Sequence, residues 1–379
     1  MTMSFAPGAH LAAIAAALAC VGCNVIFGIE PGESRPPPSS ECAPPRPAQC
    51  DAPSQDDPEA CCTAGRSCQG GACVAGECGP VRIAAGPSGG DIQGVLVVAD
   101  QVIWSSGRAV RAAPIGGGAA TILAEPPDGP FQFVTNLAAD AAHVYFTDFD
   151  GPRIGRVPLG GGTAEVLAFV NRSDVIAGYG RIAVAGGHVY WAMQGGDTPD
   201  GKRGGVWRAP VDADAVEAEL VADAAMPFGV AVDDGSLYWG DDGLGIYRLA
   251  LADVGTAVEP SIVVRTPGPF GELAVDAQRI YWYEYGLVRS ASKEGGDLLD
   301  LHADASALRS LVADGRHVFW TLHGYDAAKG SVRRAPVDGS GPVVTLVDGV
   351  TAGFGGIAHD CDTVYVGNNE TYEVQRLSK

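Results

Sequence analysis

The sequence predicts an all-β protein: a seven-bladed β-propeller of four-stranded blades, closed by an N-terminal strand and preceded by a small disulfide-rich module. Two observations carry this prediction. One sequence pattern occurs seven times between residues 81 and 379, and repeated units of about 40–45 residues with four short strands are typical of propellers. The chain also contains 53 glycines and 26 prolines among 379 residues, which indicates many turns and few long helices.

The clearest part of the repeat is a triplet of one aliphatic residue followed by two mostly aromatic ones. The third members lie 38 to 48 residues apart, and an arginine follows the triplet in every copy. An aspartate lies six residues before the third member in five copies, and an alanine lies eight residues before it in five copies. The triplets begin at Val102, Val144, Val189, Leu237, Ile280, Val318 and Val364.

Each unit is expected to contain four strands, called a to d here in chain order. The unit around Trp239 has β-branched and aromatic runs at 229–233, 237–239, 246–249 and 262–264, which are typical of strands. The last copy ends after its strand c, whereas a spare strand, 81–85, precedes the first copy. We therefore expect residues 81–85 to complete the last blade and close the ring, because closure removes an exposed sheet edge.

The chain before the propeller (81–379) divides into three expected segments. Residues 1–23 are interpreted as a signal peptide, because an apolar run at 11–20 ends in small residues; the alternative is a short buried helix. Residues 24–41 form a Pro-rich linker. Residues 42–80 contain seven cysteines and few apolar residues. We expect disulfides to hold this module, with a metal cluster as the alternative.

The segment 19–23 (ACVGC) resembles a bacterial lipoprotein signal, in which cleavage leaves a lipidated cysteine as the new N-terminus. We prefer Cys23 over Cys20 as the lipidated residue. If Cys23 carries the lipid and Cys20 leaves with the signal, eight cysteines remain to pair, and an even number suits an exported, oxidised protein. The resemblance implies an exported protein held in the cell envelope by a lipid anchor, at the outer membrane or the cell surface.

The repeated Tyr-Trp pair resembles the YWTD propeller repeats of low-density-lipoprotein-receptor type and, more loosely, NHL-like bacterial propellers. The Thr-Asp that follows the pair in YWTD repeats is present once, as Thr147-Asp148, and Gly240-Asp241 is a partial match. YWTD propellers have six blades, whereas this chain has seven copies. Together with the lipoprotein-like start, the repeat resembles bacterial envelope propeller lipoproteins, a class that implies ligand display rather than a particular reaction.

The charge and the motifs of the sequence exclude several classes of function. With 25 basic and 45 acidic residues, the formal net charge is -20, so no nucleic-acid partner is expected. The glycine clusters lack the Lys-Ser or Lys-Thr of a phosphate-binding loop, and no cofactor is expected. His143, His188 and His317 repeat one turn position, and the acidic fragments 148–151 and 241–243 do not continue into calcium loops. We interpret these histidines and these acidic fragments as structural residues.

Antiparallel strands place the loops between strands b and c and the crossings from strand d to the next strand a on one face of the ring, which we name the ligand face. Exposed aromatic residues over a central channel would form a binding site there. The alternative is that the same aromatic residues fill the core. The candidate ligand-binding residues are Phe131, Phe133, Asn136, Phe228, Phe270, Phe354, Asp197, Asp200 and Tyr325.

Two functions compete for this face. The first is an envelope-anchored binding or scaffolding propeller whose ligand is an unknown protein, peptide or glycan. The alternative is a calcium-dependent lactonase or hydrolase, which needs acidic and amide side chains pointing into the channel. Asn136 is the one amide near the start of a strand a, and no catalytic residue is identified, so we favour binding. Three or more carboxylates or amides converging on the axis would favour the enzyme.

Cys361 is the only cysteine of the predicted propeller. It follows strand a of the last blade, on the same face as the start of the closing strand, which comes just after Cys78. Three strand spacings separate the two cysteines by about 14 Å, whereas a disulfide needs Cα atoms within about 7 Å. The chain at Gly79-Pro80 would have to fold back. We predict a Cys361–Cys78 disulfide, with Cys73 as the second choice and a buried thiol as the alternative.

Overall fold

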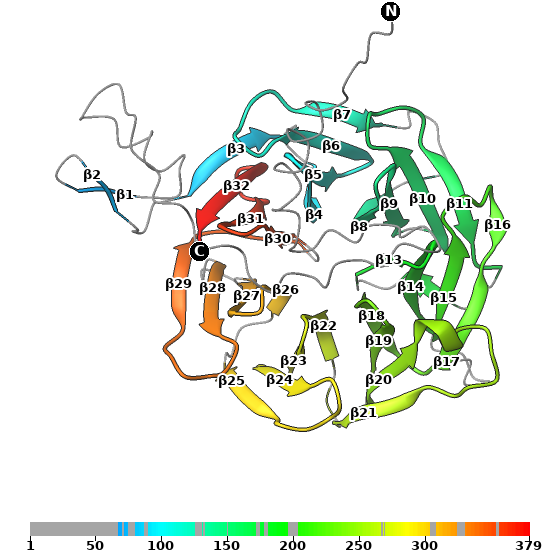
Figure 1. Cartoon of the computed structure of the whole chain (residues 1–379). Helices are drawn as coiled ribbons and strands as arrows, with labels where there is room; N and C mark the ends of the chain where they lie inside the picture. The colour runs from blue at the N-terminus through cyan, green and yellow to red at the C-terminus, as the bar shows by residue number, and fades with distance from the viewer. Residues whose placement is uncertain are drawn as a thin grey trace, which may run out of the picture.

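The computed structural model describes residues 67–69, 72–74, 80–86, 90–125, 131, 133–149, 151–171, 175–177, 181–195, 204–266, 268, 270–303, 308–323, 330–353 and 356–379. Within these ranges the chain forms a ring of seven antiparallel blades around a central axis (Figure 1). The one helical element of the described part is the 3₁₀ turn η1 (Leu251–Asp253). The predicted all-β fold with seven four-stranded blades is therefore confirmed.

The first three blades are built from neighbouring stretches of chain. Blade 1 contains β4 (Ile92–Val98), β5 (Gln101–Ser106), β6 (Ala109–Pro114) and β7 (Thr121–Ala124). Blade 2 contains β8 (Val134–Ala139), β9 (His143–Asp148), β10 (Arg153–Pro158) and β11 (Glu165–Phe169), with β16 (Val216–Glu217) parallel to β11. Blade 3 contains β13 (Ala183–Ala185), β14 (His188–Gly195), β15 (Gly204–Pro210) and β17 (Glu219–Ala224), and β12 (Val175–Ala177) also pairs with β14.

The remaining blades follow the same order from the axis outward. Blade 4 contains β18 (Pro227–Val232), β19 (Ser236–Asp241), β20 (Gly245–Ala250) and β21 (Ser261–Arg265). Blade 5 contains β22 (Phe270–Val275), β23 (Arg279–Glu284), β24 (Leu287–Ser292) and β25 (Leu299–Ala303). Blade 6 contains β26 (Leu308–Ala313), β27 (His317–Leu322), β28 (Ser331–Pro336) and β29 (Val344–Asp348). Blade 7 contains β30 (Ile357–His359), β31 (Thr363–Asn368), β32 (Glu373–Ser378) and β3 (Val81–Ala85).

The ring closes as the sequence predicts. Strand β3 pairs antiparallel with β32, with Val81 opposite Arg376 and Ala85 opposite Glu373. It is therefore the outer strand of the last blade, and Figure 1 shows it beside the red β32. Its Ile83 and Ala84 are buried, so closure adds packing as well as backbone hydrogen bonds.

The triplet explains how neighbouring blades pack. Because side chains alternate across a strand, the first and third members of a triplet face one neighbour and the second member faces the other. Tyr238 of blade 4 accordingly packs with Ile280 and Trp282 of blade 5. The same arrangement recurs at the interface between blades 7 and 1, where Tyr365 packs with Trp104. One pattern therefore supplies the core of every interface.

The repeated aspartate joins two neighbouring strands. In each of its five copies one carboxylate oxygen accepts the backbone N–H groups of the turn between strands a and b. In four copies the other oxygen accepts the hydroxyl of the triplet tyrosine at 2.5 to 2.9 Å: Asp140–Tyr145, Asp233–Tyr238, Asp276–Tyr281 and Asp360–Tyr365. In the fifth copy Phe319 has no hydroxyl, and Lys379 Nζ contacts Asp314 instead at 2.7 Å.

Several of the repeated arginines pair with an acid directly opposite on strand d. These pairs are Arg156–Glu165, Arg208–Glu219 and Arg289–Asp300. These three arginines have a structural role, because each pair ties strand c to the outer edge of its blade.

Removing one tyrosine hydroxyl should test the aspartate contact. We expect Tyr281→Phe to lower the free energy of unfolding by about 1.5–3 kcal/mol, because it removes a hydrogen bond to a charged group. Asp276→Asn in the Tyr281→Phe background should then cost less than Asp276→Asn alone. Urea denaturation of the four proteins gives the coupling energy, and strictly additive losses would contradict the contact.

The predicted N-terminal segments are largely outside the described residues. The signal peptide (1–23) with Cys20 and Cys23, and the linker (24–41), lie there entirely. In the Cys-rich module (42–80), β1 (Ser67–Gln69) and β2 (Ala72–Val74) form a hairpin with Cys68 opposite Cys73. No helix in the described part of the chain is long and apolar enough to cross a membrane.

Cys361 lies in the turn between β30 and β31 and is partly exposed. Its predicted partner Cys78 is outside the described residues, so the disulfide stays a prediction. Peptide mapping without reduction should find a cross-linked peptide that contains Cys361 and a cysteine of the 42–80 module. Full alkylation of Cys361 in the native protein would contradict the bond.

Candidate functional site

One of the predicted aromatic candidates, Phe131, is more buried than a ligand surface requires. Phe131 has no exposed surface and packs edge-on against Phe146, with ring centroids 4.9 Å apart. A Cβ on Gly155 would overlap both rings, so this glycine provides the space that they fill. Phe131 therefore belongs to the core between blades 1 and 2, which was the alternative interpretation of these residues.

The other candidates are half-buried, buried or outside the described residues. Phe133 and Phe228 are half-buried, Phe133 against Phe149 and Phe228 against the core between blades 4 and 5. Asn136 is buried in β8. The side chain of Phe270 and the whole of Phe354, Asp197, Asp200 and Tyr325 lie outside the described residues, so their predicted roles stay untested.

Acidic residues at the end of strand b anchor the crossings of the ligand face. Asp148 accepts the N–H of Phe133, and Asp241 accepts the N–H groups of Ala225 and Met226. Glu284 holds the same position in blade 5 and accepts the N–H of Gly268. Asp148 and Asp241, each from one of the two acidic fragments interpreted as structural, therefore hold these crossings by hydrogen bonds.

A ring of equivalent positions surrounds the channel mouth on the ligand face. It lies ten residues before the third triplet member and consists of Gly94, Asn136, Arg181, Gly229, Glu272, Ser310 and Gly356. In five blades the pairing of strands a and b is irregular at this point, and such β-bulges redirect side chains. The polar members of this ring can therefore point toward the axis.

Arg181 crosses the channel from blade 3. Its Nε donates to Glu272 Oε2 of blade 5 at 2.8 Å, and its Nη2 donates to Ser310 Oγ of blade 6 at 3.0 Å. Nη2 also lies 3.3 Å from the carbonyl oxygen of Ile357 in blade 7. One side chain thus connects four blades across the axis.

Glu272 is the buried partner in this cluster. Its side chain is 4% exposed, and its Oε1 has no hydrogen-bond partner among the described residues. Burial raises the pKa of Glu272, and Arg181 opposes that rise. The axial cluster therefore contains a carboxylate engaged by a guanidinium, and in the described ranges no group of three or more His, Cys, Asp or Glu residues is placed to hold a metal ion.

A pocket of about 430 Å³ lies on the ligand face where blades 6, 7 and 1 meet. Blade 6 contributes Arg309 and His323, the crossing into blade 7 contributes Thr351 to Gly353, and blade 1 contributes Asp91 and Gln93. The loop between β31 and β32 contributes Asn369, Glu370 and Tyr372. The pocket therefore combines residues from the two ends of the propeller sequence, which ring closure brings together.

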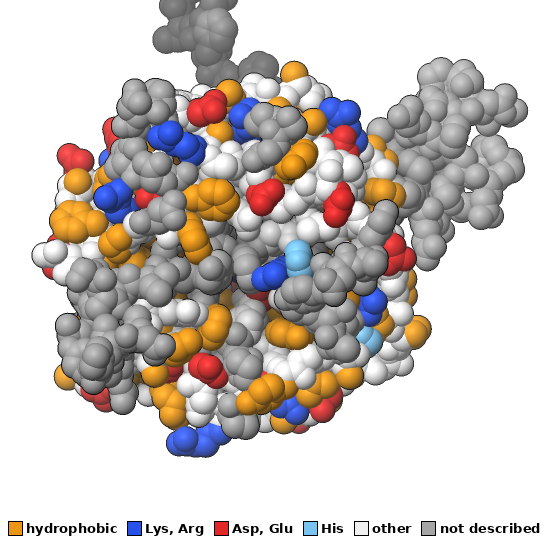
Figure 2. Space-filling model, turned by 180° about the vertical axis from the view of Figure 1, so that it is seen from behind, with side chains coloured by type: hydrophobic (Ala, Val, Ile, Leu, Met, Phe, Trp, Pro, Cys, Tyr) orange, Lys and Arg blue, Asp and Glu red, His pale blue; other side chains and the backbone are white. Residues whose placement is uncertain are grey.

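The two sides of the pocket differ in charge. Arg309 and His323 are on the side of blade 6, whereas Asp91 and Glu370 are on the side of blades 1 and 7. Burial lowers the pKa of His323, and the nearby Arg309 lowers it further, so His323 is neutral at pH 7. The view from behind shows a histidine beside a basic side chain near the middle of the face, with acidic side chains around them (Figure 2).

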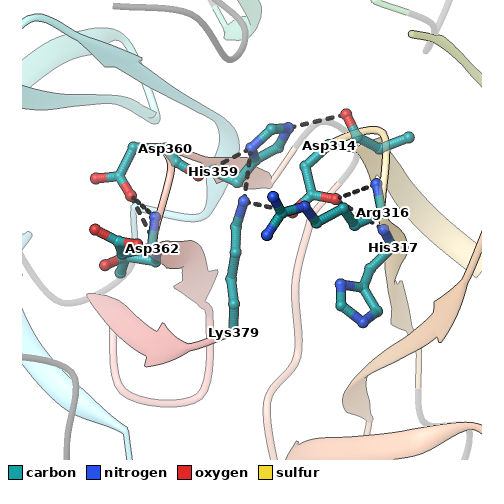
Figure 3. Close-up of polar contacts among 9 residues, drawn as sticks. Asp314, Arg316, His317, His359, Asp360, Asp362 and Lys379 are labelled. Carbon is teal, nitrogen blue, oxygen red and sulfur yellow. Dashed lines mark hydrogen bonds and ion pairs between the residues drawn. The ribbon is translucent and has the colours of Figure 1, made fainter. Parts of the chain in front are cut away.

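A second polar cluster lies at the a–b turns of blades 6 and 7 (Figure 3). Lys379 Nζ is 2.7 Å from Asp314 Oδ2 and 3.2 Å from His359 Nδ1. His359 Nε2 is 3.1 Å from the carbonyl oxygen of Ala313. The neutral tautomer with the proton on Nε2 satisfies these two contacts, because Nε2 then donates and Nδ1 accepts from the ammonium group. Nδ1 also lies 3.2 Å from the carbonyl oxygen of Asp360, a contact that this tautomer leaves without a proton.

The buried His359 should make stability depend on pH. Burial, with the nearby Lys379, lowers the pKa of His359 from 6.5 to about 4. Between these values the unfolded chain binds a proton that the folded chain does not. Stability from this group is therefore lost as the pH falls from 6.5 to 4, by about 3 kcal/mol.

Substitution of His359 tests this expectation. Valine is the residue at the equivalent position in blades 1, 3, 4 and 5, so His359→Val preserves the packing of strand a and removes the titration. Urea denaturation at pH 6.5, 5.5 and 4.5 should show a smaller loss of stability in the variant. An equal loss in both proteins would contradict the assignment.

The fold defines a seven-bladed β-propeller whose polar pocket lies at the ring closure. Comparison with protein families and with curated proteins finds no match. Many solved structures share the fold. A catalytically inactive virginiamycin B lyase from Staphylococcus aureus, solved with quinupristin, is 13% identical over 79% of this chain and 98% of its own, with a TM-score of 0.58.

Two other similar structures are propellers of different kinds. The WD40 β-propeller domain of Doa1 is 17% identical, covers 78% of this chain and 95% of its own, and has a TM-score of 0.55. YCF48 bound to D1 peptide is 11% identical, covers 80% of this chain and 96% of its own, and has a TM-score of 0.55. At these identities the likeness shows the fold alone.

Proposed function

We propose that this protein is a binding propeller that takes a protein or peptide segment in the pocket between blades 6, 7 and 1. The observation that supports the proposal is the pocket itself. It is concave, its volume falls in the range of about 300–1,000 Å³ found for ligand sites, and it combines charged, amide and aromatic side chains. Those groups provide hydrogen bonds and specificity rather than an obvious reacting centre.

The similar structures support a binding role only by analogy of fold. YCF48 was solved with a peptide bound, whereas the virginiamycin B lyase is an enzyme. The calcium-dependent hydrolase alternative needs ligands for a cation at the axis. Arg181 is already in contact with Glu272 there, and a guanidinium repels a second cation at the same carboxylate. Metal analysis of the purified protein tests this alternative.

We further propose that the propeller is exported and held in the cell envelope by a lipid on Cys23. The support is the sequence of residues 1–23, with its apolar run and the cysteines at 20 and 23. Mass spectrometry of the mature N-terminus should find a lipidated cysteine at position 23. An unmodified Met1, or cleavage away from both cysteines, would refute the anchor.

Selection of displayed peptides tests the binding role. Peptides enriched on the immobilised propeller should bind Arg309→Glu at least about tenfold more weakly, because the variant reverses the charge on one side of the pocket. Arg316→Glu is the matched control, since Arg316 is exposed on blade 6 in the turn between β26 and β27. Absence of enrichment would refute the binding role, and equal binding by both variants would place the ligand elsewhere.

A further inference from the structure

Three groups suited to an ammonium ion line one side of the pocket. Asp91 begins blade 1, and Glu370 and Tyr372 belong to the loop between β31 and β32. Both acids are exposed, and Tyr372 is half-buried. Carboxylates form strong hydrogen bonds with charged N–H donors, and the face of an aromatic ring attracts a cation. This side of the pocket therefore favours a positively charged group.

The backbone at Tyr372 is held in an unusual conformation. Its φ is 57°, which is the left-handed region that a bulky residue adopts rarely. The N–H of Gly86, next to the closing strand, donates to the carbonyl oxygen of Tyr372 at 2.7 Å. Residues held in such conformations cluster at functional sites, and here the strained residue lines the pocket.

The floor between the two sides is fixed by hydrogen bonds. Asn369 Oδ1 accepts the N–H of Ile92 at 2.7 Å, and the N–H of Asn369 donates to the carbonyl oxygen of Thr351 at 2.8 Å. The Thr351 hydroxyl donates to Glu370 Oε1 at 3.2 Å. A Cβ on Gly353 would overlap the carbonyl oxygen of Ile92. The acidic side is therefore preorganised by contacts that cross from blade 7 to blade 1.

Arg309 on the opposite side offers donors for an oxygen ligand. The pocket then contains one guanidinium and two carboxylates, and the protein as a whole has a formal net charge of -20. This balance attracts a ligand whose cationic end carries more charge than its anionic end. A peptide amino end fits, because an ammonium group is followed immediately by carbonyl oxygens.

We propose that the pocket captures the free amino end of a peptide, with the ammonium group between Asp91, Glu370 and Tyr372 and a following carbonyl oxygen on Arg309. Capture of terminal groups is an established mode of peptide recognition. This inference rests on the proposed binding function and specifies its ligand. A pocket of about 430 Å³ accommodates the first residues of a chain rather than a folded domain.

The probes are the synthetic tripeptide Ala-Gly-Gly-amide and its N-acetylated form, measured by isothermal titration calorimetry on the full chain. The free amine should bind, and acetylation should weaken binding at least about tenfold. Asp91→Asn and Glu370→Gln should each weaken binding of the free amine by about tenfold. Glu259→Gln is the matched control, because this exposed acid lies between β20 and β21 on the opposite face, and it should bind as the wild type does.

Tyr372→Asn separates the ring from the backbone. Asparagine tolerates the left-handed conformation best among ordinary residues, so the variant should keep its melting temperature and lose binding. Equal affinity for the acetylated peptide, or unchanged binding in both acid variants, overturns the amino-end proposal. If displayed peptides bind in the pocket but acetylation has no effect, the amino-end proposal fails alone. If no peptide is enriched, the proposed function fails as well.

Discussion

Removing the closing strand is expected to destabilise the whole propeller rather than one blade. Ile83 of β3 is 4% exposed and packs in the core that includes Trp104 of blade 1 and Tyr365 of blade 7. Ile83→Asp places a carboxylate in that core and should lower the free energy of unfolding by about 4–5 kcal/mol. Deletion of residues 81–85 should cost at least as much, because it also leaves β32 as an open edge.

The neighbouring Arg82 provides the control. Its side chain is 61% exposed and forms one surface ion pair with Glu373 at 3.3 Å. Arg82→Ser should therefore change stability by less than about 1 kcal/mol. Calorimetry or urea denaturation compares the three proteins. If deletion of residues 81–85 leaves the melting temperature unchanged, the ring does not depend on this strand.

The fold could be predicted from the repeat because the same packing pattern recurs in all seven blades. The alternation within each triplet follows from strand geometry, and the interfaces from Tyr190–Trp239 to Tyr365–Trp104 obey it. Even the aspartate six residues before the triplet end had a visible signal, since it accompanies tyrosine in four copies. In blade 6 the partner of the aspartate is Lys379 instead of a tyrosine. Lys379 lies 65 residues away from Asp314, and no sequence pattern indicated this contact.

The candidate site was harder to predict because its residues do not repeat. Aromatic residues before strand a suggested a ligand surface, but Phe131 fills space left by Gly155, and that fit depends on tertiary packing. The pocket joins Asp91 to Glu370, which ring closure brings together from distant parts of the sequence. Ring closure was predicted from the sequence. The loop side chains at the junction of blades 7 and 1, however, follow no periodic pattern that would have identified them as pocket residues.

The axial contact had a signal that was overlooked. Arg181 and Glu272 occupy the same repeat position, ten residues before the triplet end, where glycine is found in three other copies. Charged residues at a position that is otherwise small indicate a special role. Their mutual contact across 91 residues follows only from the ring geometry.

Breaking the axial pair from one side should cost far more than breaking a surface pair. Arg181→Met leaves the buried Glu272 without its cation, and removal of one partner of a buried pair typically costs about 3–5 kcal/mol. Without Arg181, the pKa of Glu272 should rise further above its ordinary value, because the guanidinium now opposes the effect of burial. The loss of stability caused by Arg181→Met should therefore be smaller at low pH, where Glu272 is protonated, than at pH 7.

Arg208→Met in blade 3 is the control, because its partner Glu219 is 53% exposed and stays hydrated when the arginine is removed, so the loss should be smaller than for Arg181→Met. The double variant Arg181→Met/Glu272→Met should recover most of the loss, since paired apolar replacements of buried ions are often neutral. Urea denaturation at pH 7 and pH 4.5 measures all four proteins. If Arg181→Met costs no more than Arg208→Met, or the double variant is no more stable than Arg181→Met, the pair does not hold the blades together across the axis.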